Sequence, residues 1–189
     1  MLTDDFAGRI ATLWSELRPS TRGLVERALQ ETSGNTQTSR NSHYDARADL
    51  ELSRFLAALD AEEGNNLRSI ADTCAAVLLE KTESAEVFTQ LVRRAQSQRD
   101  YQRIDILADA LNSRFPPSEI CELARSEDVV VRELANEALA RCPTSVLTEL
   151  LHDPVDAETA GAALRRQVVE YGSEEARQIV NALDQADEM

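Results

Sequence analysis

The stretch DVVVRELANEALARCP, residues 128–143, has the pattern of an amphipathic helix that stops at a proline. Val131, Ala135 and Leu139 follow one another at intervals of four residues, which places them on one face of an α-helix. Pro143 ends such a helix because proline has no backbone N–H and its ring clashes with the preceding turn. The stretch therefore predicts a helix that buries one side and ends just before this proline.

The same apolar pattern occurs once before and once after this stretch. Val131 lies 27 residues after Ile104, and Ala160 lies 29 residues after Val131. The three aligned sets are Ile104, Leu107, Ala108, Leu111, Asn112, Phe115 and Pro116; Val131, Leu134, Ala135, Ala138, Leu139, Cys142 and Pro143; and Ala160, Ala163, Leu164, Gln167, Val168, Tyr171 and Gly172. Only Asn112 and Gln167 interrupt the apolar columns, and each set closes on Pro or Gly, which end helices.

A shorter helical segment is expected after each of these stops. The three segments open near Ser118, Thr144 and Ser173, residue types that commonly cap a helix. A pair of antiparallel helices cannot bury both of its faces alone, whereas stacked pairs bury a continuous core. The repeat therefore predicts an α-solenoid of antiparallel helix pairs.

Apolar residues keep a helical period in residues 1–83 as well. The exception is residues 32–45, rich in Ser, Thr and Asn, which we predict to form a long polar loop that is either a plain surface loop or a segment that orders on binding. The six Gly, five Pro and 4% aromatic content favour helices with an aliphatic core. We expect an all-α protein of about 11 helices. Its amino-terminal helical region, 1–83, continues into the repeats, 84–189, as one domain.

Two stretches of the repeat region resemble HEAT repeats, particularly the short bacterial kind. The matching residues are Asp128, Val131, Arg132, Ala135, Ala138 and Leu139 in the first, and Leu150, Asp153, Pro154, Ala162, Ala163 and Leu164 in the second. The resemblance covers roughly residues 84–187. It implies a right-handed solenoid of the HEAT or armadillo type that serves as a protein-binding scaffold, and it implies no reaction.

The HEAT resemblance also implies a role for one Asp and one Arg. In the family, an Asp near the turn and an Arg of the second helix tend to bond across neighbouring repeats, and Asp128 and Arg132 fit that role. The aligned positions of the flanking repeats hold Asp105 and Gly161. We therefore expect no continuous ladder of such bonds.

The charge of the chain is strongly negative and unevenly spread. The net charge is −14, and residues 116–189 contain 16 acidic against six basic residues, hence −10 of the total. Such a surface repels phosphate backbones, so we expect no nucleic-acid partner, and it attracts basic proteins. The chain has no long apolar run and no signal-like start, so we expect a cytoplasmic protein without membrane association.

No pattern in the sequence indicates catalysis. Cys74, Cys121 and Cys142 are widely spaced and fall on apolar faces, which favours buried packing over a disulfide framework or a zinc site. His43 lies in the polar loop, and His152 is expected at the negative end of a short helix. Nucleotide-binding, hydrolase and metal-spaced motifs are missing from the sequence. We therefore expect no enzyme, no cofactor and no bound metal.

The solvent-facing positions of the second helices form the candidate partner-binding face, because these helices usually line the inner side of a solenoid. They are Tyr101, Asp105, Asp109, Glu133, Asn136, Glu137, Arg141, Arg165 and Arg166. Arg and aromatic residues are common anchors in protein interfaces. Two interpretations are open: a face that grips a peptide or helix, and a merely solvated surface.

The sequence therefore favours a non-catalytic interaction or scaffold protein that binds another protein along this face. The alternative is an acidic neutralising protein, of the antitoxin, immunity or nucleic-acid-mimic type, that blocks a basic partner. Salt separates the two hypotheses, because charge neutralisation weakens steeply as ionic strength rises. The polar carboxyl-terminal end favours a monomer, whereas the face that contains Trp14 is either packed inside or dimeric, so we expect a monomer or a weak homodimer.

Overall fold

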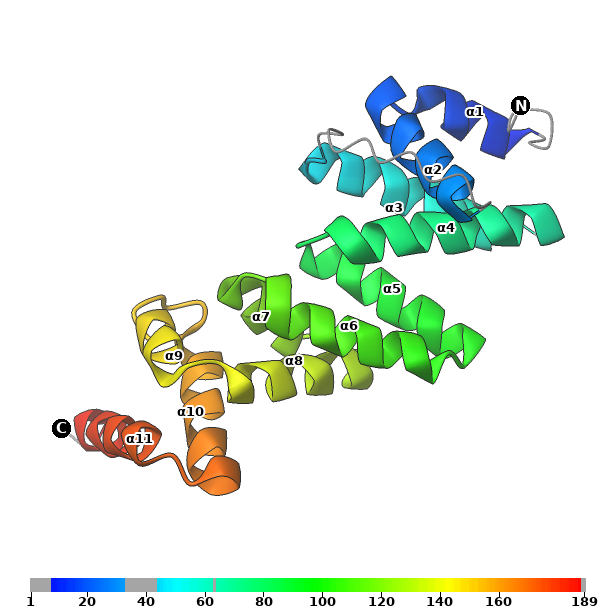
Figure 1. The fold of residues 1–189 in the computed structure, drawn as a ribbon. Coiled ribbons are helices and arrows are strands. Elements are labelled where there is room, and N and C mark those ends of the chain that lie inside the picture. The colour runs from blue at the N-terminus through cyan, green and yellow to red at the C-terminus, as the bar shows by residue number, and fades with distance from the viewer. Residues whose placement is uncertain (1–7, 33–43, 63, 188–189) are drawn as a thin grey trace. The chain divides into compact units, whose positions relative to one another are not determined.

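The computed structural model describes residues 8–62 apart from 33–43, and residues 64–187. The described residues form helices and no strands (Figure 1). The helices are α1 (Arg9–Glu16), α2 (Pro19–Thr32), α3 (Ala46–Asp60), α4 (Asn65–Lys81), α5 (Ala85–Gln98), α6 (Tyr101–Arg114), α7 (Pro117–Ala124), α8 (Val129–Arg141), α9 (Thr144–Leu150), α10 (Ala157–Tyr171) and α11 (Glu174–Asp187). The prediction of an all-α protein with about 11 helices is confirmed for these residues. The predicted loop at 32–45 falls largely on residues 33–43, which lie outside the described residues, as does His43.

The chain divides into two compact units, Met1–Leu91 and Val92–Met189, and the boundary along the chain falls within α5. The structure describes each unit by itself. The predicted organisation, with a helical region at 1–83 that continues into repeats at 84–189 as one domain, stays a prediction.

In the first unit, each helix contacts the helix two places further along the chain: α1 contacts α3, and α2 contacts α4. The consecutive helices α3 and α4 also lie against each other. Its core is largely aliphatic and includes an aromatic pair. Trp14 and Phe55 bring their ring centroids to 5.4 Å, and both side chains are buried. Leu52, Leu56 and Leu78 complete this core with no exposed area. Ile10 and Trp14 of α1, and Leu52, Leu56 and Leu59 of α3, recur at helical spacing and are buried, in agreement with the helical period of the sequence.

One arginine connects the turn between α1 and α2 to the start of α3. The guanidinium of Arg18 donates to both oxygens of Asp45, at 3.0 and 2.6 Å, and to Glu51 at 2.9 Å. Asp45 also caps α3 by accepting from the backbone N–H of Ala48. Thr21, which is fully buried, donates to Glu51 at 2.6 Å. The bidentate contact fixes the direction in which α3 begins.

The second unit brings equivalent helices together in chain order. α6 contacts α8 and α8 contacts α10, while α7 contacts α9 and α9 contacts α11 (Figure 1). Leu107, Leu139 and Leu164 are fully buried where these helices meet, whereas Leu134 is partly exposed. The repeated apolar columns therefore correspond to packing between helices that are neighbours in the chain order.

The helices of this unit end where the repeat predicts and begin differently from the prediction. α6, α8 and α10 stop before Phe115, before Cys142 and at Gly172, whose φ of 63° is left-handed. Ser173 caps α11, since its hydroxyl accepts from the backbone N–H of Ala176. The expected caps Ser118 and Thr144 are wrong, because α7 already begins at Pro117 and Thr144 follows the cap position of Pro143. Proline suits the start of a helix, where an N–H has no partner within the helix.

The two polar residues that interrupt the apolar columns have different roles. Gln167 is 6% exposed, and its amide nitrogen donates to the carbonyls of Cys142 at 2.7 Å and Ala140 at 3.2 Å. Its amide oxygen accepts from the hydroxyl of Thr144 at 3.2 Å. The last carbonyls of α8 have no partner within their own helix, so Gln167 on α10 satisfies them. Asn112 is exposed and donates to a carbonyl of its own helix.

Arginines also hold the helix starts of this unit. Asp128 caps α8 and accepts from Arg93 of α5 at 3.3 Å. Asp156, which precedes α10 and is 4% exposed, accepts from Arg125 at 2.8 Å. Arg132, which the HEAT resemblance assigned to a bond between repeats, instead donates to a carbonyl of the turn before its own helix. Asp128 therefore bonds to Arg93 of an earlier helix, and Arg132 does not make the bond between repeats that the resemblance implies.

Replacing Gln167 with Leu leaves the carbonyls at the end of α8 without their donor. We expect this variant to lower the free energy of unfolding by about 1–3 kcal/mol, the cost of an unsatisfied buried polar group. Asn112→Leu is the control, because it also replaces a side-chain amide with Leu, but at an exposed position whose amide donates only within its own helix. We expect a change within about 0.5 kcal/mol there. Urea denaturation followed by circular dichroism measures both, and equal losses would contradict the role of Gln167.

Candidate functional site

The nine predicted partner-binding residues divide between different parts of the second unit. All are at least partly exposed, with Tyr101 72% accessible. Three of the four on α8 and one of the two on α10 come together in a single cluster, formed by Glu133, Glu137, Arg141 and Arg166. Arg165 bonds instead to Asp184 of α11 at 2.8 Å. The side chains of the other four, Tyr101, Asp105, Asp109 and Asn136, make no ion pair or hydrogen bond with a described residue.

Glu137 is the centre of this cluster. One of its carboxylate oxygens accepts from Arg166 at 3.0 Å, and the other accepts from Arg141 at 2.8 Å and from the hydroxyl of Tyr171 at 3.3 Å. Arg166 also bonds to Glu170 at 2.7 Å. The hydroxyl of Tyr171, followed by the charge of Glu137, raises the pKa of Arg141, and Glu170 raises the pKa of Arg166. Both arginines therefore carry a full charge that is locally balanced.

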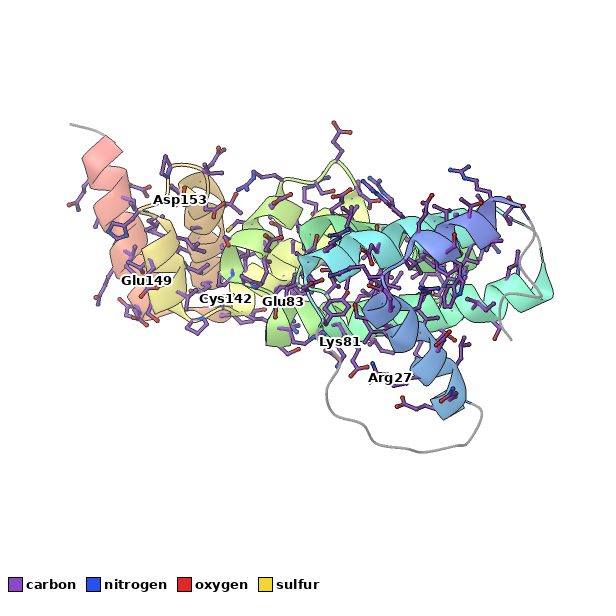
Figure 2. All side chains as sticks on the ribbon, turned by 90° about the horizontal axis from the view of Figure 1, so that it is seen from above. Arg27, Lys81, Glu83, Cys142, Glu149 and Asp153 are labelled. Atoms are coloured by element: carbon purple, nitrogen blue, oxygen red, sulfur yellow. The ribbon has the colours of Figure 1, made fainter. Side chains whose placement is uncertain are left out.

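Two hollows adjoin this network where α8 meets α10. The first, of about 340 Å³, is lined by the apolar Val129, Val130 and Leu134 and by the charged Glu133, Glu137 and Arg166. The second, of about 350 Å³, lies at the ends of the two helices, and Tyr171, Gln167 and Cys142 are among its lining residues. Cys142, which follows the end of α8, is labelled in Figure 2. Because Glu137 lines the first hollow and its partner Tyr171 lines the second, the network borders both. We call the first hollow, with its six residues, the α8 groove.

Sequence reasoning did not select two members of the network, Glu170 and Tyr171. Tyr171 was assigned to the apolar column of Phe115 and Cys142, but it is 53% exposed. A signal was present in the repeat itself. The spacing of 29 residues that aligns the apolar columns also aligns Glu137 with Arg166 and Arg141 with Glu170, so opposite charges stand at equivalent positions.

The cysteines have unreactive surroundings. Cys121 is fully buried, and desolvation raises the pKa of its thiol to about 12. Burial also raises the pKa of Cys142, although that residue is partly accessible. Since the thiolate is the reactive form, both thiols are poor nucleophiles.

The remaining polar groups have structural settings. His152 is exposed at the end of α9, where Nδ1 lies 3.2 Å from the carbonyl oxygen of Glu149. In the part of the chain that the structure describes, no three His, Cys, Asp or Glu side chains gather as metal ligands would. Within the same residues, no helix combines the length and apolarity needed to span a bilayer.

No family model, curated protein or solved structure matches the chain. We call the Glu137 network together with the two hollows beside it the α8–α10 surface, and its own residues indicate its role.

The first unit contains a buried carboxylate that the sequence did not reveal. Asp49 is 8% exposed and accepts hydrogen bonds from the hydroxyls of Tyr44 and Thr82. Desolvation raises the pKa of Asp49, while these two hydrogen bonds oppose the shift. Asp49 lies in the first turn of α3, where the helix dipole favours a negative charge. Thr82 ends α4, so this contact joins two helices.

Asp49 makes the stability of the protein depend on pH. A raised pKa in the folded state means that the folded protein binds the proton more tightly, so stability falls as pH rises through that pKa. We expect Asp49→Asn to flatten this decline and to melt at or above the wild-type temperature at pH 7. Asp49→Ala should lose about 1–3 kcal/mol, because the buried hydroxyl of Thr82 loses its acceptor. Thermal melts from weakly acidic to neutral pH test this, and a steeper decline for the Asn variant would contradict it.

The network around Glu137 should contribute little to folding. Arg141 is 57% exposed, Glu137 36% and Arg166 29%, and ion pairs at such positions are typically worth less than about 1 kcal/mol. We expect Glu137→Gln to change the free energy of unfolding by no more than that. Urea denaturation at low and high salt measures the change. A loss of several kcal/mol would show that the network is part of the core instead of a surface feature.

Proposed function

We propose that this chain is a non-catalytic protein-binding module whose partner docks on the α8–α10 surface. The observation that carries the proposal is the combination of the Glu137 network with the α8 groove. The exposed Tyr171 and the arginines Arg141 and Arg166 lie beside apolar side chains of the groove. Tyrosine and arginine are enriched in protein interfaces. Ion pairs as exposed as these add little to the stability of the fold. Binding of a partner would give these ordered charges a role.

We further propose that the second unit is a short right-handed α-solenoid of the HEAT type. The support is the succession of contacts from α6 to α8 to α10 and from α7 to α9 to α11. The bond between Glu137 and Arg166 supports it as well, because it joins residues at the spacing of the repeat. None of Cys74, Cys121 and Cys142 is joined in a disulfide, which supports the cytoplasmic setting expected from the sequence.

The second candidate is an acidic neutralising protein, favoured by the net charge of −10 in residues 116–189. In that case the whole acidic surface contributes, and no single groove decides binding. Raising the salt concentration from about 50 to 500 mM would then abolish binding, because the screening length falls from above 10 Å to a few ångströms. A partner held by the α8 groove would bind more weakly but would stay bound, because its contacts with the apolar side chains do not depend on salt.

Site-specific photo-cross-linking tests the docking surface. A photoreactive amino acid placed at Val129 or at Tyr171, both exposed, should form an adduct with the same protein in a lysate of the producing cells. The control position is Glu122, an exposed residue of α7 that lines neither hollow. Adducts that form equally at Glu122, or at Glu122 alone, would contradict docking on the α8–α10 surface. Mass spectrometry of the adduct identifies the partner.

A further inference from the structure

The α8 groove has an apolar part that water reaches. Val129 is 60% exposed, and Val130 and Leu134, which line the same groove, are partly exposed. All three lie on α8 within one and a half turns, so the groove follows the side of a single helix. A helix laid against such a row inserts its own apolar side chains at intervals of three and four residues.

The charges around the groove leave one carboxylate without a partner. Glu137 already accepts from two arginines and a tyrosine, and Glu170 pairs with Arg166. Glu133 acts on Arg166 only through space and makes no hydrogen bond or ion pair with the described residues. Three carboxylates therefore stand against two guanidinium groups, and the unpaired one borders the apolar row.

On the basis of the proposed function, we propose that the α8 groove receives a basic amphipathic helix. Its apolar side chains cover Val129, Val130 and Leu134, and a Lys or Arg on its flank pairs with Glu133. An acidic segment would meet the free carboxylate and the surrounding net charge of −10. A second copy of this chain, with a net charge of −14, would be repelled for the same reason. Charge complementarity thus selects the basic helix among these occupants.

A synthetic peptide tests this without knowledge of the natural partner. The probe is a fluorescein-labelled peptide of about four helical turns, with Leu on one face and Lys on the other. Two comparison peptides carry either Glu in place of each Lys, or the same Leu and Lys in an order that gives no apolar face. Fluorescence anisotropy with the full chain should show binding of the probe and much weaker binding of both comparison peptides.

Two variants and a charge-matched control locate the site. Glu133→Lys should weaken binding of the probe at least tenfold, and Val129→Ser severalfold, because one removes the acceptor for the basic residue and the other an apolar contact. Glu122→Lys makes the same change in net charge on α7, outside the groove, and should alter binding less than twofold. Both altered groove residues are exposed, so the variants should keep the wild-type helix content and melting curve.

Each other outcome overturns the inference. Failure of the probe to bind, or equal binding of the scrambled peptide, rules out recognition of an amphipathic helix. Tighter binding of the acidic peptide reverses the class of partner, and equal losses with Glu122→Lys and Glu133→Lys show attraction to net charge alone. The cross-linking experiment does not use these peptides. An adduct at Val129 without binding of the probe would therefore keep the docking surface and reject only the basic helix.

Discussion

The groups left unpaired at helix ends are the constraint on which this structure depends. Short helices end often, and each end leaves N–H or C=O groups that need partners when they are buried. Side chains from other helices or turns either bond to these groups directly or bond to the residue that caps them. Arg18 donates to Asp45, the cap of α3, and Arg93 donates to Asp128, the cap of α8. Gln167 donates to the carbonyls at the end of α8. These long-range contacts fix where one helix lies against the next within each unit, which apolar packing alone leaves less defined.

The shortest helices show why such contacts matter. α7 has eight residues and α9 has seven, lengths at which an isolated helix is not stable in water. Both begin beside a proline that sets the backbone before the first turn. Their stability must come from burial, and Leu123 and Leu147 are correspondingly inaccessible. A chain with few aromatic residues thus builds its core from many small aliphatic contacts between helices.

The helices could be predicted from the sequence because their signals are local. Apolar periodicity and stop residues lie within each segment, and Leu107 and Leu164 are buried as expected. Gln167 seemed an exception to its column because its partners are carbonyls 25 and 27 residues away. The candidate surface was predicted only in part. Arg165 and Arg166 are adjacent in sequence, but one turns to α11 and the other to α8, since successive helical residues point about 100° apart.

The Glu137 network has a consequence for the entropy of association. Long arginine side chains lose conformational freedom when a partner immobilises them, at about 0.5–1.5 kcal/mol each. Arg141 and Arg166 are already held by Glu137, so much of this loss occurs on folding instead of on docking. An arriving protein would meet a surface whose shape and charges are preset. Its residence time would then depend mainly on how well it excludes water from the valines and leucine beside that network.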